Sequence, residues 1–368
     1  MKIKPLLLCS FLLFLNSASA DEIVVPENVA STTSSQPAMQ SQPQPTSDQV
    51  SSSTMRRKNI RKSPYMFTVM GEYLYLQAKE EGLEYALPDS TGNTGPILSQ
   101  GVVGRVHRIE PKFHSGYRVG VGYLLPHRKG LFSAQWMHFG GSHDDHAKEL
   151  VGEGIWPFWL NQFNAPSAKT AHARWHLDMD VFDLQIGTPF RVKNFLTLQP
   201  FAGFRAAWID QDLDIRYGNI MFIESGTTTP FIKSDNDLHF HGYGICGGLL
   251  TKWKIWKGFS FFANGSASLL WSRFKTSQKE TIFDGSIRSN ISDRLFTTTP
   301  VFEFMAGLAW EYEWKSVGLE LHFGWEEQIW LHQNMLNRYI DSFTHGATMT
   351  ANGNLSLAGY NARASLRF

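Results

Sequence analysis

The chain has 368 residues, and its 34 lysines and arginines nearly balance its 33 aspartates and glutamates, for a formal net charge of +1. This balance argues against a general nucleic-acid binder. Aromatic residues make up 14% of the sequence, which is hard to accommodate inside a small soluble barrel, and the two cysteines are Cys9 and Cys246.

Residues 1–20 predict a secretory signal peptide. Two lysines precede an apolar run over residues 5–15, and small residues close the segment, in the order typical of such a signal. The apolar run is too short to span a bilayer as a helix. We expect cleavage after residue 20. Cys9 would leave with the signal, so Cys246 has no partner for an intrachain disulfide.

Residues 21–63 predict a disordered tether, because Ser, Thr, Gln and Pro dominate and almost nothing is apolar enough to bury. A basic run lies near its end: Arg56, Arg57, Lys58, Arg61 and Lys62. Such a run either contacts anionic lipid or another polyanion, or is solvated without a partner. The solvated run is the simpler interpretation.

From Tyr65 onward the apolar residues repeat with the period of two that is typical of strands, and no run is long enough for a transmembrane helix. In "VFEFMAGLAWEYEW", for example, Phe302, Phe304 and Trp310 alternate with Glu303 and Glu311. The predicted strands are 65–78, 112–125, 131–141, 172–188, 195–212, 237–252, 259–275, 298–314, 317–331 and 354–368. After Val181 the apolar phase shifts, and we expect a β-bulge there.

The predicted connections alternate in length. Short links, "PHRKG", "FRVKN", "WKIWKG" and "KS", separate long ones at 79–111, 142–171, 213–236, 276–297 and 332–353. Tight turns on one side and long loops on the other are typical of a bacterial outer-membrane barrel. Residues 64–368 therefore predict an all-β transmembrane antiparallel up-and-down barrel of about ten strands, with eight or twelve as alternatives.

A soluble sandwich or lipocalin-like barrel would show the same alternation with the faces reversed. Aromatic placement favours the membrane barrel, because seven tryptophans lie toward strand ends on the apolar face, as in interfacial girdles: Trp136, Trp175, Trp208, Trp271, Trp310, Trp314 and Trp325.

Several stretches resemble the Legionella-type major outer membrane protein family, which is also found in chlamydia-like bacteria. They are "FTVMGEYLYLQAKEEGLEYA", "FHSGYRVGVGY", "LQPFAGFRAAWIDQDLDIRY" and "GNLSLAGYNARASLRF". The resemblance covers most of residues 65–368 and implies a pore-forming role in a Gram-negative outer membrane, without identifying a solute. The ending, with Phe368, Leu366 and Tyr360, also resembles the sorting signal read by the barrel-assembly machinery.

Three motifs have a simpler structural interpretation than a functional one. Gly242-x-Gly244-x-x-Gly247 matches a dinucleotide fingerprint but lies inside a predicted strand, where glycines allow close backbone approach. "SHDDH" offers His143, Asp144, Asp145 and His146 to a metal, but a long loop is expected there. Asn290-Ile-Ser matches a glycosylation sequon by pattern alone. We expect no cofactor and no metal site.

An outer-membrane hydrolase would need an acid and base pair near the barrel mouth. Asp144 with His146, or Asp178 with His176, could supply one, but no recognisable motif accompanies either pair. We read His176 and Asp178 as two lumen residues, and we expect no enzyme.

The predicted lumen carries many charges: Glu303, Glu311, Glu313, Glu320, His322 and Glu326 on two adjacent strands, Arg363 and Arg367 on the last, and Arg118, Arg174 and Arg205 elsewhere. An acidic wall facing basic ones selects solutes by charge, which predicts a porin-like pore. Alternatively the charges pair and fill a narrow interior, as in a closed anchor or adhesin. The expected partners are outer-membrane lipid, the barrel-assembly machinery and small hydrophilic solutes; the oligomeric state stays open.

Overall fold

The structure is a computed structural model that describes residues 66–88, 104–125, 130–148, 154–163, 166–314, 317–339 and 348–368. The predicted signal peptide, the tether and its basic run lie outside the described residues. The described residues all belong to one compact unit, Arg61–Phe368. In this part of the chain, no helix is long and apolar enough to cross a membrane.

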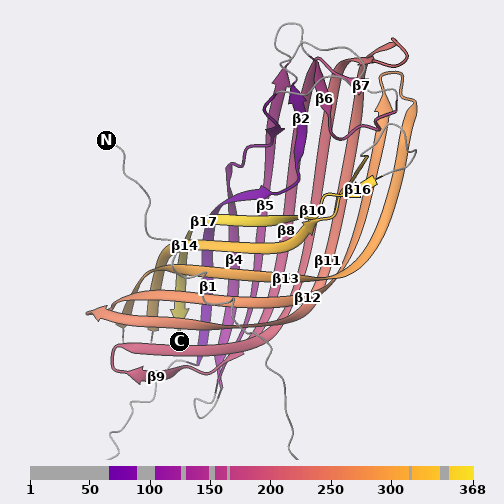
Figure 1. Ribbon diagram of the computed structural model, residues 1–368. Helices are drawn as coiled ribbons and strands as arrows, with labels where there is room; N and C mark the ends of the chain where they lie inside the picture. The colour runs from indigo at the N-terminus through magenta and orange to yellow at the C-terminus, as the bar shows by residue number, and fades with distance from the viewer. Residues whose placement is uncertain are drawn as a thin grey trace, which may run out of the picture. The chain divides into compact units, whose positions relative to one another are not determined.

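Ten strands form a closed antiparallel barrel (Figure 1). They are β1 (Phe67–Glu80), β4 (Phe113–Leu124), β5 (Leu131–Lys148), β8 (Thr170–Gly187), β10 (Leu196–Phe222), β11 (Thr228–Trp256), β12 (Phe259–Ile282), β13 (Ile287–Trp314), β14 (Val317–Asn334) and β17 (Gly353–Arg367). Each pairs with the next along the chain, and β17 pairs with β1 to close the barrel. The predicted fold class and strand number are confirmed.

Short strands decorate this barrel. β2 (Glu84–Pro88) pairs with both β3 (His107–Arg108) and β6 (Ile155–Pro157) in a small separate sheet. β15 (Asn337–Tyr339) pairs with β16 (Thr348–Thr350), while β7 (Pro166–Ser167) and β9 (Phe190–Lys193) pair with β10.

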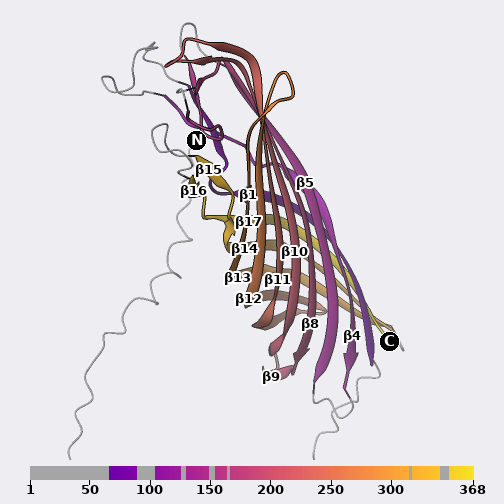
Figure 2. The same cartoon turned by 90° about the vertical axis from the view of Figure 1, so that its right-hand side faces the viewer.

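Two of the predicted long loops are wrong. Residues 213–236 and 276–297 continue β10 to β13 as paired strands, which turn only at 223–227 and 283–286. β5 likewise runs on to Lys148, into the predicted loop 142–171. Pairing between β13 and β14 stops at Val301 and Trp330, so the longest strands continue beyond the ends of their shorter neighbours (Figure 2).

The barrel wall reverses its polarity along the strands. In β8, Trp175 and Met179 face inward and are buried, while His176 faces outward; further down, Ile186 faces outward and Asp183 faces inward. β8 pairs with β5 and β10 without any shift of register. The predicted β-bulge after Val181 is therefore wrong: the medium outside the wall changes from water to lipid, and the backbone phase does not change.

Aromatic side chains mark the lipid-facing band of the outer wall. Trp136, Trp271, Trp314 and Trp325 are exposed there, as predicted for interfacial girdles. Trp175 is an exception, because it is only 2% exposed and lies inside the barrel. The prediction that Trp175 faces lipid was wrong because the medium outside the wall changes from water to lipid along β8, which also explains the apparent bulge.

The tight turns that the structure describes, at 194–195 and 257–258, lie at the end of the barrel where Phe368 follows the last strand. Lys257 and Gly258 join β11 to β12 with φ angles of 24° and 91°, which a two-residue hairpin turn favours. Short turns are typical of the periplasmic side of outer-membrane barrels. The opposite end, where β10 to β13 extend, is therefore the extracellular end.

Candidate functional site

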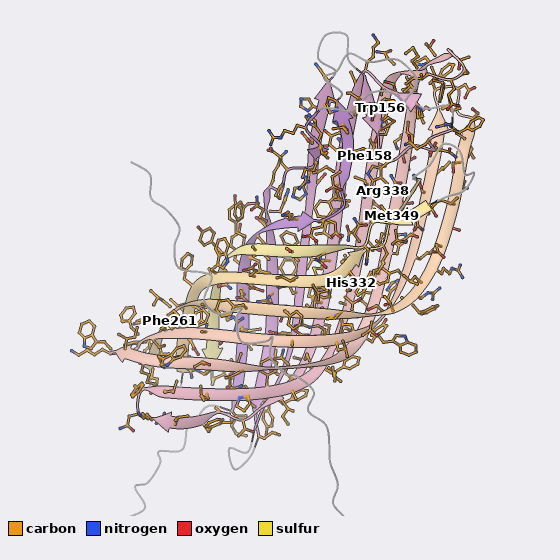
Figure 3. The ribbon with its side chains drawn as sticks, in the orientation of Figure 1. Trp156, Phe158, Phe261, His332, Arg338 and Met349 are labelled. Atoms are coloured by element: carbon orange, nitrogen blue, oxygen red, sulfur yellow. The ribbon has the colours of Figure 1, made fainter. Side chains whose placement is uncertain are left out.

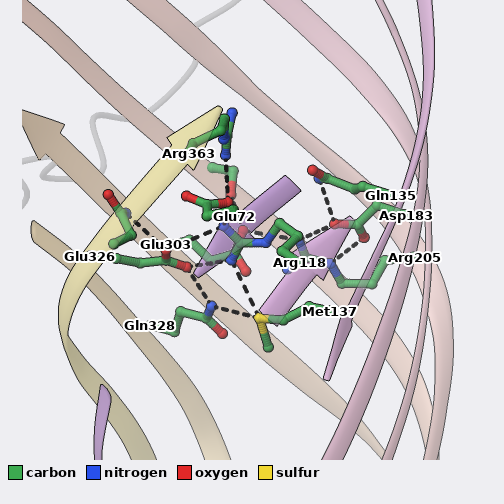
Figure 4. Close-up of polar contacts among 12 residues, drawn as sticks. Glu72, Arg118, Gln135, Met137, Asp183, Arg205, Glu303, Glu326, Gln328 and Arg363 are labelled. Carbon is green, nitrogen blue, oxygen red and sulfur yellow. Dashed lines mark hydrogen bonds and ion pairs between the residues drawn. The ribbon is translucent and has the colours of Figure 1, made fainter. Parts of the chain in front are cut away.

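The interior of the membrane-spanning part is lined by ionised side chains from many strands (Figure 4). Arg118 on β4 lies between two carboxylates, with Nη1 2.7 Å from Glu72 on β1 and Nη2 2.5 Å from Glu326 on β14. Arg363 on β17 approaches the same Glu72 carboxylate at 2.9 Å. The side chains of Glu72 and Glu326 are 1% and 2% exposed, so each depends on these partners for its charge.

A second group joins strands that are far apart in the barrel. Arg205 on β10 donates two hydrogen bonds to Asp183 on β8, at 2.7 and 2.8 Å, and a third to Glu303 on β13 at 2.9 Å. Ser266 and Gln135 donate to Glu303 and Asp183 respectively. The fork of Arg205 thus holds two carboxylates in one geometry.

A third group lies nearest the periplasmic end. Lys252 on β11 contacts both Glu311 on β13 and Glu320 on β14. His322 Nε2 lies 2.6 Å from Glu320, and Arg367 on β17 lies 3.4 and 3.5 Å from the carboxylates of Glu311 and Glu320. These side chains are partly exposed, so water reaches this level of the lumen.

We call these three groups together the charged interior. It contains the cations Arg118, Arg205, Lys252, Arg363 and Arg367, the carboxylates Glu72, Asp183, Glu303, Glu311, Glu320 and Glu326, and His322. Opposite charges from different strands meet in direct pairs rather than facing each other across an open gap. Instead of the predicted acidic wall facing basic walls, the structure has a network of ion pairs.

On the extracellular side of the charged interior, large apolar side chains dominate the packing, although polar residues such as Gln211 and Asn236 are also buried there. Trp175, Phe240, Phe274 and Trp330 are at most 2% exposed, and the ring of Phe240 packs edge-on against those of Phe274 and Trp330, at 5.0 and 6.3 Å. Large rings from several strands thus fill the extracellular half of the barrel with a continuous hydrophobic core.

The segment 154–163 enters this core from the extracellular end, where Trp156 and Phe158 lie in Figure 3. Trp159 is fully buried and donates to the Glu84 carbonyl oxygen at 2.7 Å. The backbone N–H of Asn161 donates to Glu280 Oε1 at 2.6 Å. Arg288 contacts the other Glu280 oxygen at 3.3 Å, and burial still raises the pKa of the Glu280 carboxyl to about 7.

Most of the predicted lumen residues point into the barrel and pair there: Arg118, Arg205, Glu303, Glu311, Glu320, His322, Glu326, Arg363 and Arg367. Glu313 shares the inward phase of Glu311 but is exposed, one residue before the end of β13. Arg174 was wrongly placed in the lumen. It lies on the outer wall, 58% exposed, and pairs with Asp144 at 2.7 Å.

Three members of the charged interior were missed from the sequence: Glu72, Asp183 and Lys252. Glu72 had a usable signal, because it stands alone among apolar residues in "VMGEYLYL" and has the inward phase of Leu74 and Leu76. Asp183 was hidden by the change of polarity in β8, which had been attributed to a bulge.

The other motifs are separated or explained by strand geometry. "SHDDH" lies in β5 rather than in a loop, so its residues alternate between faces: His143 is buried against His114 and Trp175, while Asp144 faces outward. His176 and Asp178 are not lumen residues as predicted, because they lie on the outer wall. Among the residues that the structure describes, one group could offer three metal ligands, and it is His138, Asp178 and Asp180 on that wall.

The glycine motif lies inside β11, as expected. A Cβ atom at Gly244 would lie 1.9 Å from the Leu269 carbonyl oxygen on β12, so close approach of the two strands requires glycine there. Strand continues through all three glycines, and no helix follows that could hold a pyrophosphate.

Some solved outer-membrane proteins are similar to this chain at low identity. The outer membrane protease OmpT from Escherichia coli has 11% identity and a TM-score of 0.40, covering 83% of this chain and 97% of its own. The P. putida toluene transporter TodX has 10% identity and a TM-score of 0.32, covering 82% and 89%. At these values neither likeness carries a functional argument. No curated protein sequence matches the chain.

A family model matches nearly the whole of the described chain. Its description is Legionella pneumophila major outer membrane protein precursor, and the match covers residues 62–368. The match begins a few residues before β1 and ends at the terminal Phe368, so it spans every strand of the barrel. This chain therefore belongs to the Legionella major outer membrane protein family, and it is a β-barrel protein of the outer membrane.

Proposed function

We propose that the protein is a porin-like, pore-forming protein that lets small hydrophilic solutes or ions diffuse across the outer membrane. The observation that carries this proposal is the charged interior. Placing so many ionised groups inside a barrel costs desolvation energy, and a purely structural barrel could fill the same space with apolar side chains at no loss of stability. Rings of charged side chains are how pores select ions.

Passage also requires the extracellular half to open. Trp159 and Leu160 of segment 154–163 are buried in the apolar core, so the described conformation corresponds to a closed state of the pore. We propose that displacement of this segment opens a path to the charged interior. Its displacement would break the pairing of β6 with β2 and the hydrogen bonds that join Trp159 to the Glu84 carbonyl oxygen and Asn161 to Glu280.

The packed core favours a second candidate function, a permanently closed barrel that serves as an envelope anchor or adhesin. The long extracellular hairpins of β10 to β13 would then be the functional surface. We propose no enzymatic activity: both Asp and His pairs considered for a hydrolase lie on the outer wall, and Asp144 of one pair is bound to Arg174.

Single-channel recording decides between the two candidates. The purified, heat-modifiable barrel in a planar bilayer should show discrete conductance steps. The double variant Glu311→Gln with Glu320→Gln removes two carboxylates from the level that water reaches, leaving Lys252 and Arg367 in excess, so the reversal potential should shift toward anions. As a control, Glu224→Gln in the extracellular turn 223–227 should leave selectivity unchanged.

Silence from a correctly folded barrel at all voltages would refute the pore and leave the closed anchor or adhesin. Conductance without any change of selectivity in the double variant would place the conducting path away from the charged interior.

A further inference from the structure

Three cations gather on the outer wall of β12 and β13, outside the charged interior. Lys275 and Arg294 lie directly opposite each other in the strand register, and Arg273 is on the same face one step closer to the membrane. All three side chains are exposed, because the alternate residues Phe274 and Thr276 face the core. We call these three residues the outer basic patch.

The outer basic patch lacks acidic partners. Among the residues that the structure describes, none of the three forms an ion pair, whereas most cations of the interior have one or two carboxylates. Like charges directly opposite on adjacent strands are destabilising. On β11, His241 lies opposite Arg273 and His239 lies opposite Lys275. The nearby carboxylates on this face have other partners within the described part of the chain, since Asp210 contacts His239 and Asp237 accepts from Ser277.

The patch lies at a defined height above the lipid. Trp271 is 74% exposed and stands opposite Tyr243, which packs edge-on against Trp208 at 5.9 Å. These rings mark the outer boundary of the hydrocarbon layer. Arg273 follows Trp271 on the same face, so it lies roughly 5–7 Å further out at the rise of a tilted strand, where lipid headgroups lie.

An apolar surface adjoins the cations. Phe296 is 61% exposed and lies opposite Arg273, whose guanidinium is 5.8 Å from the centre of the ring. Among the described residues, 287–300 of β13 have no partner on β14. Phosphate suits the cations, since arginine and lysine are the usual partners of phosphate oxygens, and acyl chains or sugar faces suit the rings.

We propose that the outer basic patch, with Trp271 and Phe296, binds a phosphorylated glycolipid of the lipopolysaccharide type from the outer leaflet. The phosphates contact Arg273, Lys275 and Arg294, and the acyl chains pack below them against Trp271 and the apolar wall. Charge complementarity selects this occupant: three unpaired cations at headgroup height match an anionic headgroup, and the leaflet at this end of the barrel consists of such lipids.

Native mass spectrometry of the full chain, folded in detergent and titrated with bisphosphorylated lipid A, tests the proposal. The triple variant Arg273→Gln, Lys275→Gln, Arg294→Gln should lose about a hundredfold in affinity, at roughly fivefold per cation. The matched control Arg191→Gln, Lys193→Gln, Lys254→Gln removes the same charge from exposed positions near the periplasmic end and should bind as the wild type does.

Further measurements distinguish binding of the lipid from binding of free phosphate, and loss of charge from loss of folding. Lipid A without its phosphates should bind the wild type weakly, and inorganic phosphate at the same concentration should not compete, because it lacks the acyl chains. Lys275→Arg, which keeps the charge, should keep the affinity. Equal affinity of the triple variant and the wild type would overturn the proposal, as would equal losses in both triple variants or undiminished binding of dephosphorylated lipid.

Discussion

Arg118 illustrates how a single side chain holds the interior together. It bridges Glu72 on the adjacent strand β1 and Glu326 on β14, which lies two strands beyond β1, and Glu326 also accepts a hydrogen bond from Gln328. Both carboxylates are almost fully buried. Removing the cation would leave two buried negative charges, which is far more costly than replacing the whole group by apolar residues.

We predict that Arg118→Met lowers the free energy of unfolding by about 3–5 kcal/mol. The control is Arg174→Gln on the outer wall, where both members of the Arg174–Asp144 pair are exposed, and this change should cost far less than the loss of Arg118. Guanidinium unfolding of both variants in detergent micelles measures the difference. Equal costs would mean that Arg118 is not the cation on which Glu72 and Glu326 depend.

At the scale of an element, segment 154–163 is held in the extracellular half of the barrel through Glu280. This carboxylate accepts the Asn161 N–H and contacts Arg288, yet its side chain is fully buried. Desolvation raises its pKa to about 7 from an ordinary value of 4.5, because Arg288 offsets the burial only in part. Between these two pH values the folded protein keeps a proton that the unfolded chain has released.

The free energy of unfolding should therefore fall as the pH rises from about 4.5 to about 7, by up to about 3 kcal/mol, and the Glu280 contribution should stay constant above that range. Glu280→Gln cannot titrate, so this slope should be missing from the variant. Unfolding curves at pH 5 and pH 7.5 for both proteins isolate the Glu280 contribution as the difference between the two slopes. Parallel slopes would show that Glu280 does not bind its proton in this range.

At the scale of the whole molecule, closure of the barrel depends on the pairing of β17 with β1. Phe368 completes it: its backbone N–H donates to the Phe67 carbonyl oxygen at 3.0 Å, and its own carbonyl oxygen accepts from the N–H groups of Met66 and Phe67. Its ring stacks on that of Phe67 at 6.2 Å, on the lipid-facing side. Tyr360 and Leu366 are exposed on the same wall.

Deleting Phe368, or replacing it with Asp, should lower the yield of inserted barrel, because the aromatic end resembles the assembly signal and also completes the closing pair of strands. Arg367→Lys should be mild, since the inward charge near Glu311 and Glu320 is retained. Heat-modifiable protein in outer-membrane fractions measures the yield. Normal insertion of the Asp variant would refute the assembly role.

The existence of the ten strands could be predicted from the sequence, because alternation is a local property of the pleated backbone. The inward phase of Glu303, Glu311, Glu320 and Glu326 could also be predicted from the sequence, because the apolar residues that alternate with them in β13 and β14 face lipid. The sequence by itself thus determined the fold class, the approximate number of strands and much of the lumen lining.

The tertiary structure alone decided what each face of a strand touches and which charges meet. Alternation defines two faces but not the medium beside them, and that medium changes with height along β8 and β10, which is why Trp175, His176 and Arg174 were placed on the wrong sides. Partners such as Arg118 and Glu326 are far apart in the chain and meet through the register of a closed sheet. Register is a property of the whole barrel, so no local pattern encodes it.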